Sequence, residues 1–141
     1  MTIELVPLAT TRIQLEPAII LEGTPRGTRR IVELSGITIE GERLRANQKG
    51  AAAADWLLVG PDGTGMLDVR YCAETYDGAL VYVCYAGRLD ASGGLGAAPI
   101  YATPVFETGD ARYAWLNKVQ AVAKGTIDRS RVLTYEMYEL H

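Results

Sequence analysis

The sequence predicts an all-β protein, an antiparallel up-and-down β-barrel of about eight strands and of lipocalin size. Three observations support this fold class. Short segments rich in Val, Ile, Leu and Tyr alternate with turn residues, no segment of convincing length has a helical period, and Asp77-Gly78 is a strong hairpin signal. Sequential strands joined by short turns favour a barrel over a sandwich, and an eight-stranded barrel holds side chains or one small ligand.

The predicted strands are separated by glycine, proline and aspartate turns. Gly36 in the second strand predicts a bulge, and Pro104 in the sixth predicts an edge position or a bulge. The glycine-rich segment 90–99 is expected to be a flexible loop that is available as a lid. The strands are predicted at residues 8–16, 29–40, 55–59, 66–76, 79–89, 101–107, 116–126 and 131–140.

The hairpin at Asp77-Gly78 also predicts the state of the two cysteines. If these two residues form the whole loop, Cys72 faces Val83 and Cys84 lies opposite Tyr71, on the other face of the sheet. Thiols on opposite faces cannot form a disulfide, so both are expected to be free. The pattern leaves open which face of this hairpin is inward.

Composition excludes several classes of protein. The 141 residues form a single domain over residues 1–141, and the net charge of −3 without a long basic run argues against nucleic acid and anionic membranes as partners. The N-terminus lacks a secretory pattern, so a cytoplasmic location is expected. One histidine, His141, and two cysteines make a zinc site improbable, and no phosphate-loop or dinucleotide fingerprint is present. No cofactor is therefore expected.

Three charged residues are candidates for chemistry. Asp55 and Glu107 stand at strand ends, where a carboxylate in a semi-apolar barrel has a raised pKa and can transfer protons. Arg70 beside them can stabilise a developing oxyanion. The structural alternatives are a turn or cap for Asp55, backbone contacts in the Thr108-Gly109 turn for Glu107, and a cross-strand ion pair for Arg70.

Four further residues are candidates for holding a ligand. Trp56 follows Asp55, and Tyr113, Trp115 and Asn117 form an aromatic cluster with a carboxamide. In the predicted strand 116–126 the opposite face carries Lys118 and Lys124, so Trp115 and Asn117 are expected to face the barrel interior. The alternative for the aromatic residues is an ordinary place in the core.

Five strings along the chain carry a family resemblance: ADW (54–56), PDGTGMLDVRY (61–71), DGALVYV (77–83), FETGDARYAWLN (106–117) and VLTYEMYEL (132–140). In these strings most of the chain resembles the small bacterial proteins of the DUF3237 family, also called UPF0311. Such proteins are single-domain antiparallel β-barrels with no settled general activity, so the resemblance implies the same fold here. The chain differs where alanines occupy 51–54, before Asp-Trp, and in an enlarged Gly/Ala loop at 92–98.

These residues together suggest a small-molecule-binding barrel. One hypothesis is a cofactor-independent acid/base enzyme, an isomerase, cyclase, lyase or hydratase, acting on a small carbonyl, phenolic or lactone compound. It expects a pocket at one barrel end, lined by the four ligand candidates and Arg70, with Glu107 preferred over Asp55 for proton transfer. The alternatives are a non-catalytic carrier and a structural protein; in each case a homodimer or higher homo-oligomer is expected.

Overall fold

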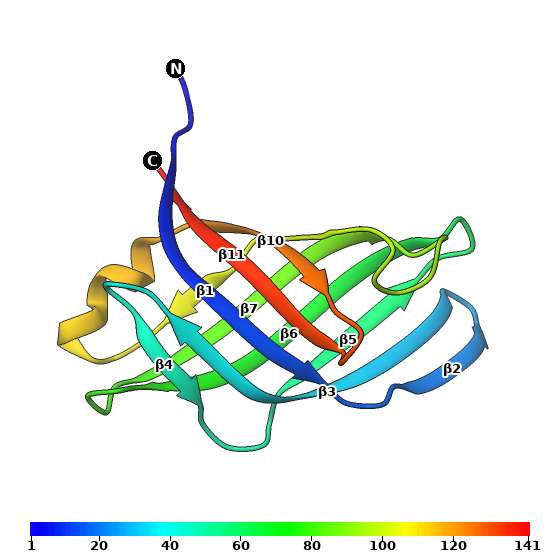
Figure 1. The fold of residues 1–141 in the computed structure, drawn as a ribbon, viewed down its shortest axis with the longest axis horizontal. Helices are drawn as coiled ribbons and strands as arrows, with labels where there is room; N and C mark the ends of the chain where they lie inside the picture. The colour runs from blue at the N-terminus through cyan, green and yellow to red at the C-terminus, as the bar shows by residue number, and fades with distance from the viewer.

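Eight antiparallel strands close into a barrel in the computed structural model, which describes all residues 1–141 (Figure 1). The predicted fold is thus confirmed. Three shorter strands and one 3-10 helix complete the chain, and no helix is long and apolar enough to cross a membrane. The barrel strands are β1 (Leu5–Leu15), β3 (Gly27–Glu40), β5 (Ala54–Val59), β6 (Thr64–Thr75), β7 (Leu80–Asp90), β8 (Ile100–Ala102), β10 (Ala121–Ile127) and β11 (Val132–Leu140); the others are β2 (Ile19–Thr24), β4 (Arg45–Gln48), β9 (Val105–Glu107) and the helix η1 (Ala111–Lys118).

The sheet closes because β6 pairs with β7 as well as with β5, and β1 pairs with both β3 and β11. Pro104 interrupts the segment after the long loop, and the two halves β8 and β9 both pair with β7. The bulge predicted at Gly36 is present: its φ is +58°, and the β1–β3 register shifts there. Strands β2 and β4, absent from the sequence prediction, pair with β3 outside the closed ring or at its end.

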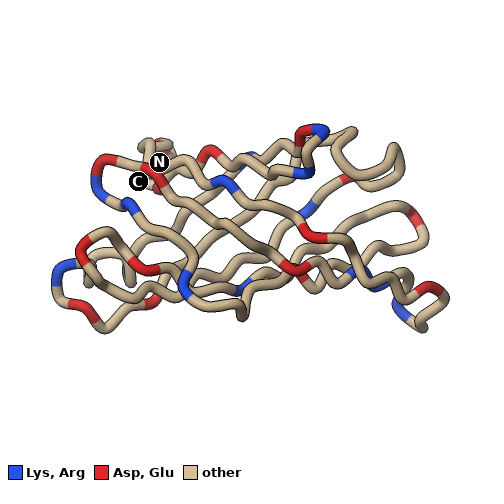
Figure 2. Tube along the Cα trace, turned by 60° about the horizontal axis from the view of Figure 1, so that its bottom comes forward, with Lys and Arg blue, Asp and Glu red and all other residues tan.

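Alternate residues of each barrel strand point inward and form the core. In β6 and β7 the buried residues include Val69, Tyr71, Val83 and Tyr85, whereas their sequence neighbours are exposed or half-buried. The inward set is more apolar because only the barrel interior excludes water. Acidic and basic residues are interspersed along the trace, as expected for a small net charge (Figure 2).

The β6–β7 turn is one residue longer than predicted, and this reverses one expectation. Tyr76, Asp77 and Gly78 form the turn, closed by a bond from the Thr75 N–H to the Ala79 carbonyl at 2.8 Å. The longer turn shifts the register by one residue, and such a shift moves side chains to the other face. Cys72 therefore lies opposite Tyr82 and Cys84 opposite Arg70, both thiols on the outer face and both free. The opposite-face placement was wrong.

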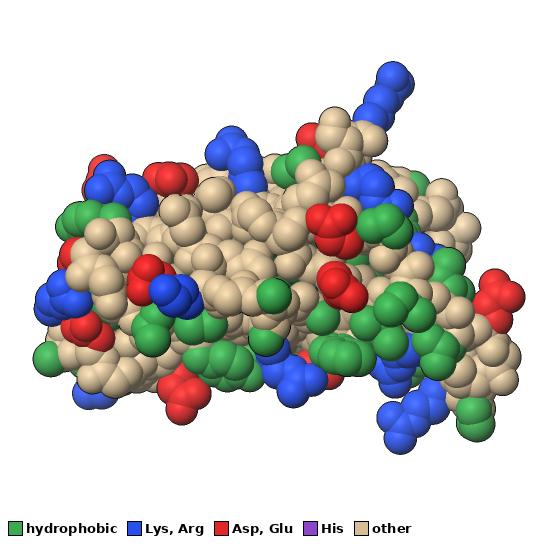
Figure 3. All heavy atoms as spheres, turned by 90° about the horizontal axis from the view of Figure 1, so that it is seen from below, with side chains coloured by type: hydrophobic (Ala, Val, Ile, Leu, Met, Phe, Trp, Pro, Cys, Tyr) green, Lys and Arg blue, Asp and Glu red, His purple; other side chains and the backbone are tan.

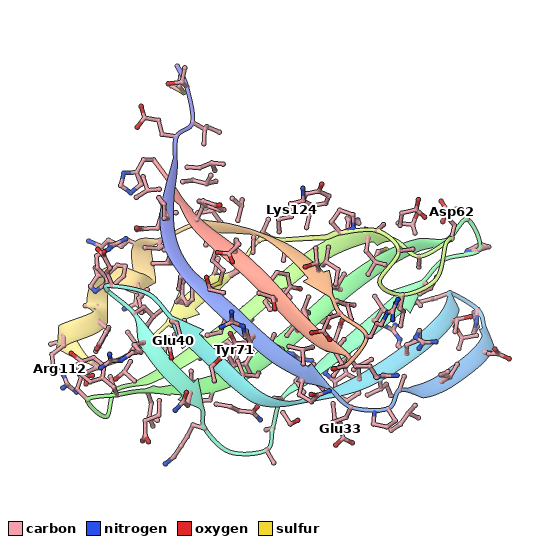
Figure 4. The ribbon with its side chains drawn as sticks, in the orientation of Figure 1. Glu33, Glu40, Asp62, Tyr71, Arg112 and Lys124 are labelled. Atoms are coloured by element: carbon pink, nitrogen blue, oxygen red, sulfur yellow. The ribbon has the colours of Figure 1, made fainter.

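The segment predicted to begin a strand at residue 116 is instead the 3-10 helix η1. Asp110 caps its N-terminus by accepting the Arg112 N–H, and strand β10 begins only at Ala121. The helix lies at one end of the barrel, beside the β6–β7 turn (Figures 1 and 4). Leu116, a residue of this helix, is fully buried. The helix was missed because it is short, and the alternation of polar and apolar residues from Lys118 onward was extended back into its last residues.

Polar contacts fasten η1 over that end of the barrel. The Tyr113 hydroxyl donates to Asp77 Oδ1 at 2.8 Å, and Arg112 bridges Asp110 and the Asp77 carbonyl. On the other side, the Arg43 guanidinium lies 4.6 Å from the ring centroid of Trp115. Arg43 also pairs with Glu139, whose side chain is almost fully buried. These contacts hold η1 in place at this end of the barrel.

Replacing Tyr113 by phenylalanine tests this attachment. The substitution removes the hydroxyl that binds Asp77 and keeps the ring, so the free energy of unfolding should fall by about 1 kcal/mol. Urea denaturation followed by tryptophan fluorescence measures the change. Tyr101→Phe, in an exposed tyrosine of β8, is the control; an equal effect in both variants would contradict the proposed role of the contact.

Candidate functional site

A wide concavity lies in a groove on the outer wall and not at a barrel end. It has a volume of about 730 Å³ and is mostly apolar, with Trp56 and Arg70 among its lining residues. Its position follows from the register, because Ile19, Ile31 and Trp56 lie side by side across β2, β3 and β5. Hydrophobic side chains gather toward the β2 side of the face seen in Figure 3. The alanines 51–54 form another part of the lining.

Polar side chains lie on the same outer face. Cys72, Tyr82 and Glu107 are successive cross-strand neighbours over β6, β7 and β9. Arg70, one pair further along, approaches Asp68 to 3.9 Å. The predicted residues Trp56, Arg70 and Glu107 thus share one face, although Glu107 is exposed and does not line the groove. Tyr82, which sequence analysis did not single out, does line it, and desolvation raises the pKa of its hydroxyl.

Asp55 lies in the same wall with its side chain on the inner face, the face that Leu57 also occupies. Between β5 and β6, the backbone pairs Ala54–Arg70 and Leu58–Met66 are formed, but Trp56 and Asp68 do not pair. The Asp68 N–H donates instead to Asp55 Oδ1 at 3.1 Å. One carboxylate oxygen therefore lies in a break of the barrel wall, next to a residue that lines the groove.

The environment of Asp55 makes it suited to proton exchange near neutral pH. Burial raises the pKa of this carboxyl from 3.8 to about 7, against the opposing effect of the Asp68 N–H, and the nearby Asp68 carboxylate raises it further. The group is thus partly protonated and partly ionised at neutral pH, the state that a general acid or base needs. Burial, the first of these causes, depends on the inward direction of the side chain.

Three tyrosines lie inside the barrel behind Asp55, and sequence analysis did not identify them. Asp55, Val69 and Tyr85 are cross-strand neighbours, and the Tyr85 and Tyr135 rings meet edge to face at 5.5 Å between centroids. Tyr71 lies in the middle of the barrel (Figure 4). Burial raises the pKa of all three hydroxyls, and the Tyr135 hydroxyl has no hydrogen-bond partner. The alternation of inward and outward residues along β6, β7 and β11 was the sequence signal that could have identified these tyrosines.

The remaining predicted residues lie at the η1 end, away from the groove. Asn117 was expected to face the interior, but it is exposed and binds the Thr108 backbone, accepting its N–H at 2.8 Å and donating to its carbonyl at 3.0 Å. Trp115 is half-buried beside Arg43, and Tyr113 is buried and bonded to Asp77. The structure thus does not bring these three residues together with Trp56 and Arg70.

The loop expected to act as a lid packs elsewhere. Its first residues lie against the β5–β6 turn, where the Ala91 N–H donates to the Gly63 carbonyl at 2.8 Å, and the loop does not line the groove. The chain contains no cluster of three or more His, Cys, Asp or Glu residues arranged to hold a metal ion.

Comparison with known proteins places this barrel among relatives of the same fold. A β-barrel-like protein from Acinetobacter baumannii AYE has a TM-score of 0.85 and 31% identity, with 100% of this chain and 98% of that chain covered. An enzyme from Penicillium herquei has a TM-score of 0.70 and 23% identity over 99% and 94% of the two chains, which shows the fold alone.

Sequence comparison identifies the family. A UPF0311 protein of Rhodopseudomonas palustris strain CGA009 is 30% identical over 119 residues, which cover 76% of this chain and 77% of that protein. The family model described as "Protein of unknown function (DUF3237)" matches residues 3–140. The chain therefore belongs to the DUF3237 family, as its sequence strings indicate.

Proposed function

We propose that this protein binds a small, largely apolar molecule in the outer groove and transfers protons to and from it without a cofactor. The observation that carries the proposal is Asp55, whose pKa of about 7 arises at a break in the wall beside Trp56. Apolar walls with few polar groups and one perturbed acid are typical of small-molecule sites.

Each residue of the proposed site has a distinct role. Trp56 and Tyr82 provide aromatic surfaces for a flat ligand, and Arg70 provides a positive charge for a carbonyl, phenolic or lactone oxygen. The ionised Asp55 carboxylate removes a proton beside the carbonyl, the enolate charge rests near Arg70, and the protonated acid returns that proton at another atom. Isomerisation, cyclisation, elimination and hydration all fit this exchange.

Asp55 replaces Glu107 as the preferred acid/base in this proposal. Neither carboxylate lines the groove, but Asp55 stands between Ala54 and Trp56, which do, and is desolvated by the barrel, whereas Glu107 is exposed on β9. Water around an exposed carboxylate weakens its action as a base on a bound ligand.

The main alternative is a carrier that binds and releases its ligand unchanged. The apolar lining of the groove favours it, because a carrier needs no acid or base. The Penicillium herquei protein is described as an enzyme, which supports the catalytic reading because this fold is then compatible with catalysis. The cytoplasm remains the proposed location, and two free thiols on the outer face support it.

Turnover in the variants Asp55→Asn and Glu107→Gln distinguishes these roles. Ligands are first found by thermal shift with small carbonyl, phenolic and lactone compounds, and turnover is then measured by mass spectrometry. Asp55→Asn should bind the ligand and lose roughly a hundredfold or more in turnover, the usual contribution of a general acid or base. Glu107→Gln should keep turnover within a few-fold of wild type. Equal turnover in all three proteins would contradict the acid/base role, and unchanged ligands throughout would favour the carrier.

Stability against pH tests the Asp55 environment without any ligand. The folded pKa of about 7 lies above the ordinary value of 3.8, so the folded state keeps this proton while the unfolded chain loses it between these pH values. The folded state is therefore penalised progressively from about pH 4 to 7, and fully above pH 7. Asp55→Asn should raise the free energy of unfolding at pH 8 by roughly 1–3 kcal/mol and change it little at pH 4. Urea denaturation with Glu107→Gln as the exposed control measures this; a variant less stable at pH 8 would refute the burial cost.

Self-association is a separate proposal, supported by strand β2. This strand pairs only with β3 and exposes Ile19, Ile20 and Leu21 by 54%, 49% and 44%. An open strand edge carrying aliphatic residues is a ready surface for pairing, and an identical edge in a second copy satisfies it symmetrically.

Light scattering at tens of micromolar protein tests this surface. The wild type should have the mass of a dimer or larger assembly, and Ile20→Lys should shift it to the monomer by placing a charge at the edge. Leu95→Lys, in an equally exposed leucine of the long loop, is the matched control and should leave the mass unchanged. A monomeric wild type would overturn the proposal.

A further inference from the structure

One backbone hydrogen bond is missing from the wall between β5 and β6, and its identity follows from the register. Gly60 N–H bonds to the Thr64 carbonyl at 2.9 Å, and bonded pairs recur at every second residue of an antiparallel ladder. Leu58–Met66 and Ala54–Arg70 continue this series, and Trp56–Asp68 should lie between them. Both that pair and the adjacent Leu57–Leu67 pair are absent, as expected if the bond from the Asp68 N–H to the Trp56 carbonyl is lost.

Side chains from opposite faces of the sheet satisfy the two separated backbone groups. Asp55, on the inner face, accepts the Asp68 N–H at 3.1 Å. Arg29 shares the outer face of β3 with Ile31, and its Nη1 donates to the Trp56 carbonyl at 2.8 Å. Both backbone groups therefore have a hydrogen-bond partner, so the break is stable within an otherwise regular ladder.

We propose that Arg29 is a positioning residue for Asp55: by holding the Trp56 carbonyl, it leaves the Asp68 N–H free to bind the Asp55 carboxylate. This inference deepens the proposed function and rests on Asp55 as its acid/base. Arg29 reaches the acid only through the backbone, across β5. Its contact with Trp56 also connects the aromatic wall of the groove to the acid behind it.

Loss of Arg29 has a definite consequence for the proton on Asp55. Without the guanidinium, the Trp56 carbonyl regains the Asp68 N–H as its nearest donor, and the ladder closes. The carboxylate then loses the hydrogen bond that opposes desolvation, so its pKa rises above about 7.

The charged and titratable groups near Asp55 come from several elements. Asp68 on β6, Tyr85 on β7 and Tyr135 on β11 interact with its carboxyl. Arg30 lies on the inner face of β3, two residues before Val32, the cross-strand neighbour of Asp55. None of these groups is changed by the substitution of Arg29.

The test is an NMR titration of the Asp55 carboxyl carbon in protein labelled with ¹³C-aspartate and ¹⁵N, assigned with Asp55→Asn. Wild type, Arg29→Met, Arg29→Lys and Arg26→Met are compared. Arg26 is a matched control because it is an exposed arginine at the β2–β3 turn whose side chain does not bind Trp56. Amide spectra with wild-type dispersion establish that each variant is folded.

Arg29→Met should raise the Asp55 pKa by about one unit or more, a tenfold change in proton affinity. The Asp68 amide shift should follow the Asp55 titration in wild type and should change less with pH in Arg29→Met. Arg29→Lys should keep the Asp55 pKa and the pH response of the Asp68 amide close to wild type, since lysine also donates to a carbonyl. Arg26→Met should match wild type in both readouts.

Arg29→Met matching wild type in both readouts would overturn the positioning role, as would an equal shift in Arg26→Met. These two readouts need no substrate, so they test the positioning role of Arg29 independently of the proposed acid/base function. Unimpaired turnover in Asp55→Asn would reject the acid/base role even where Arg29→Met shifts the titration. With a substrate in hand, the pH profile of turnover in Arg29→Met should move upward with the Asp55 pKa.

Discussion

Closure of the sheet is the constraint on which the rest of this structure depends. Every strand of the ring pairs on both edges, and only such a ring gives the interior a continuous wall that excludes water. Closure buries Tyr71, Tyr85 and Tyr135 and desolvates Asp55. It also makes any departure from regular pairing conspicuous, because unpaired backbone groups in a closed wall must find other partners.

The Trp56–Asp68 break is the departure on which the proposed function rests. A mainly apolar groove lies outside it, and the Asp55 carboxyl, whose pKa is about 7, lies on the inner face, the same face as the edge-to-face pair Tyr85 and Tyr135. Two side chains hold the break open from opposite faces, so it is a built feature of the wall. The proposed chemistry and the proposed role of Arg29 both depend on this arrangement.

Side-chain contacts attach η1 at one end of the barrel. At the η1 end, Tyr113, Arg112 and the Arg43–Glu139 pair fasten a helix over the interior. Trp115 and Asn117 serve this attachment, Asn117 by binding the Thr108 backbone and Trp115 by contacting Arg43. An aromatic cluster with a carboxamide suggests a ligand site in the sequence alone. In the structure, these side chains contact neighbouring segments and hold η1 in place.

The sequence by itself determined most of the barrel strands, the bulge at Gly36 and an irregularity at Pro104, since these depend on residues close together in the chain. Strands β2 and β4 were not predicted. It also supplied Asp55, Trp56 and Arg70 as candidates. Only the tertiary structure decided which faces they occupy. One extra residue in the Tyr76–Gly78 turn placed both cysteines outside. A helix capped at Asp110 includes residues 116–118, which were predicted to begin a strand. Asp55 is preferred over Glu107 as the proposed acid/base because its carboxyl is desolvated. That desolvation depends on β6, β7 and β11 closing around it, and those strands are distant in sequence.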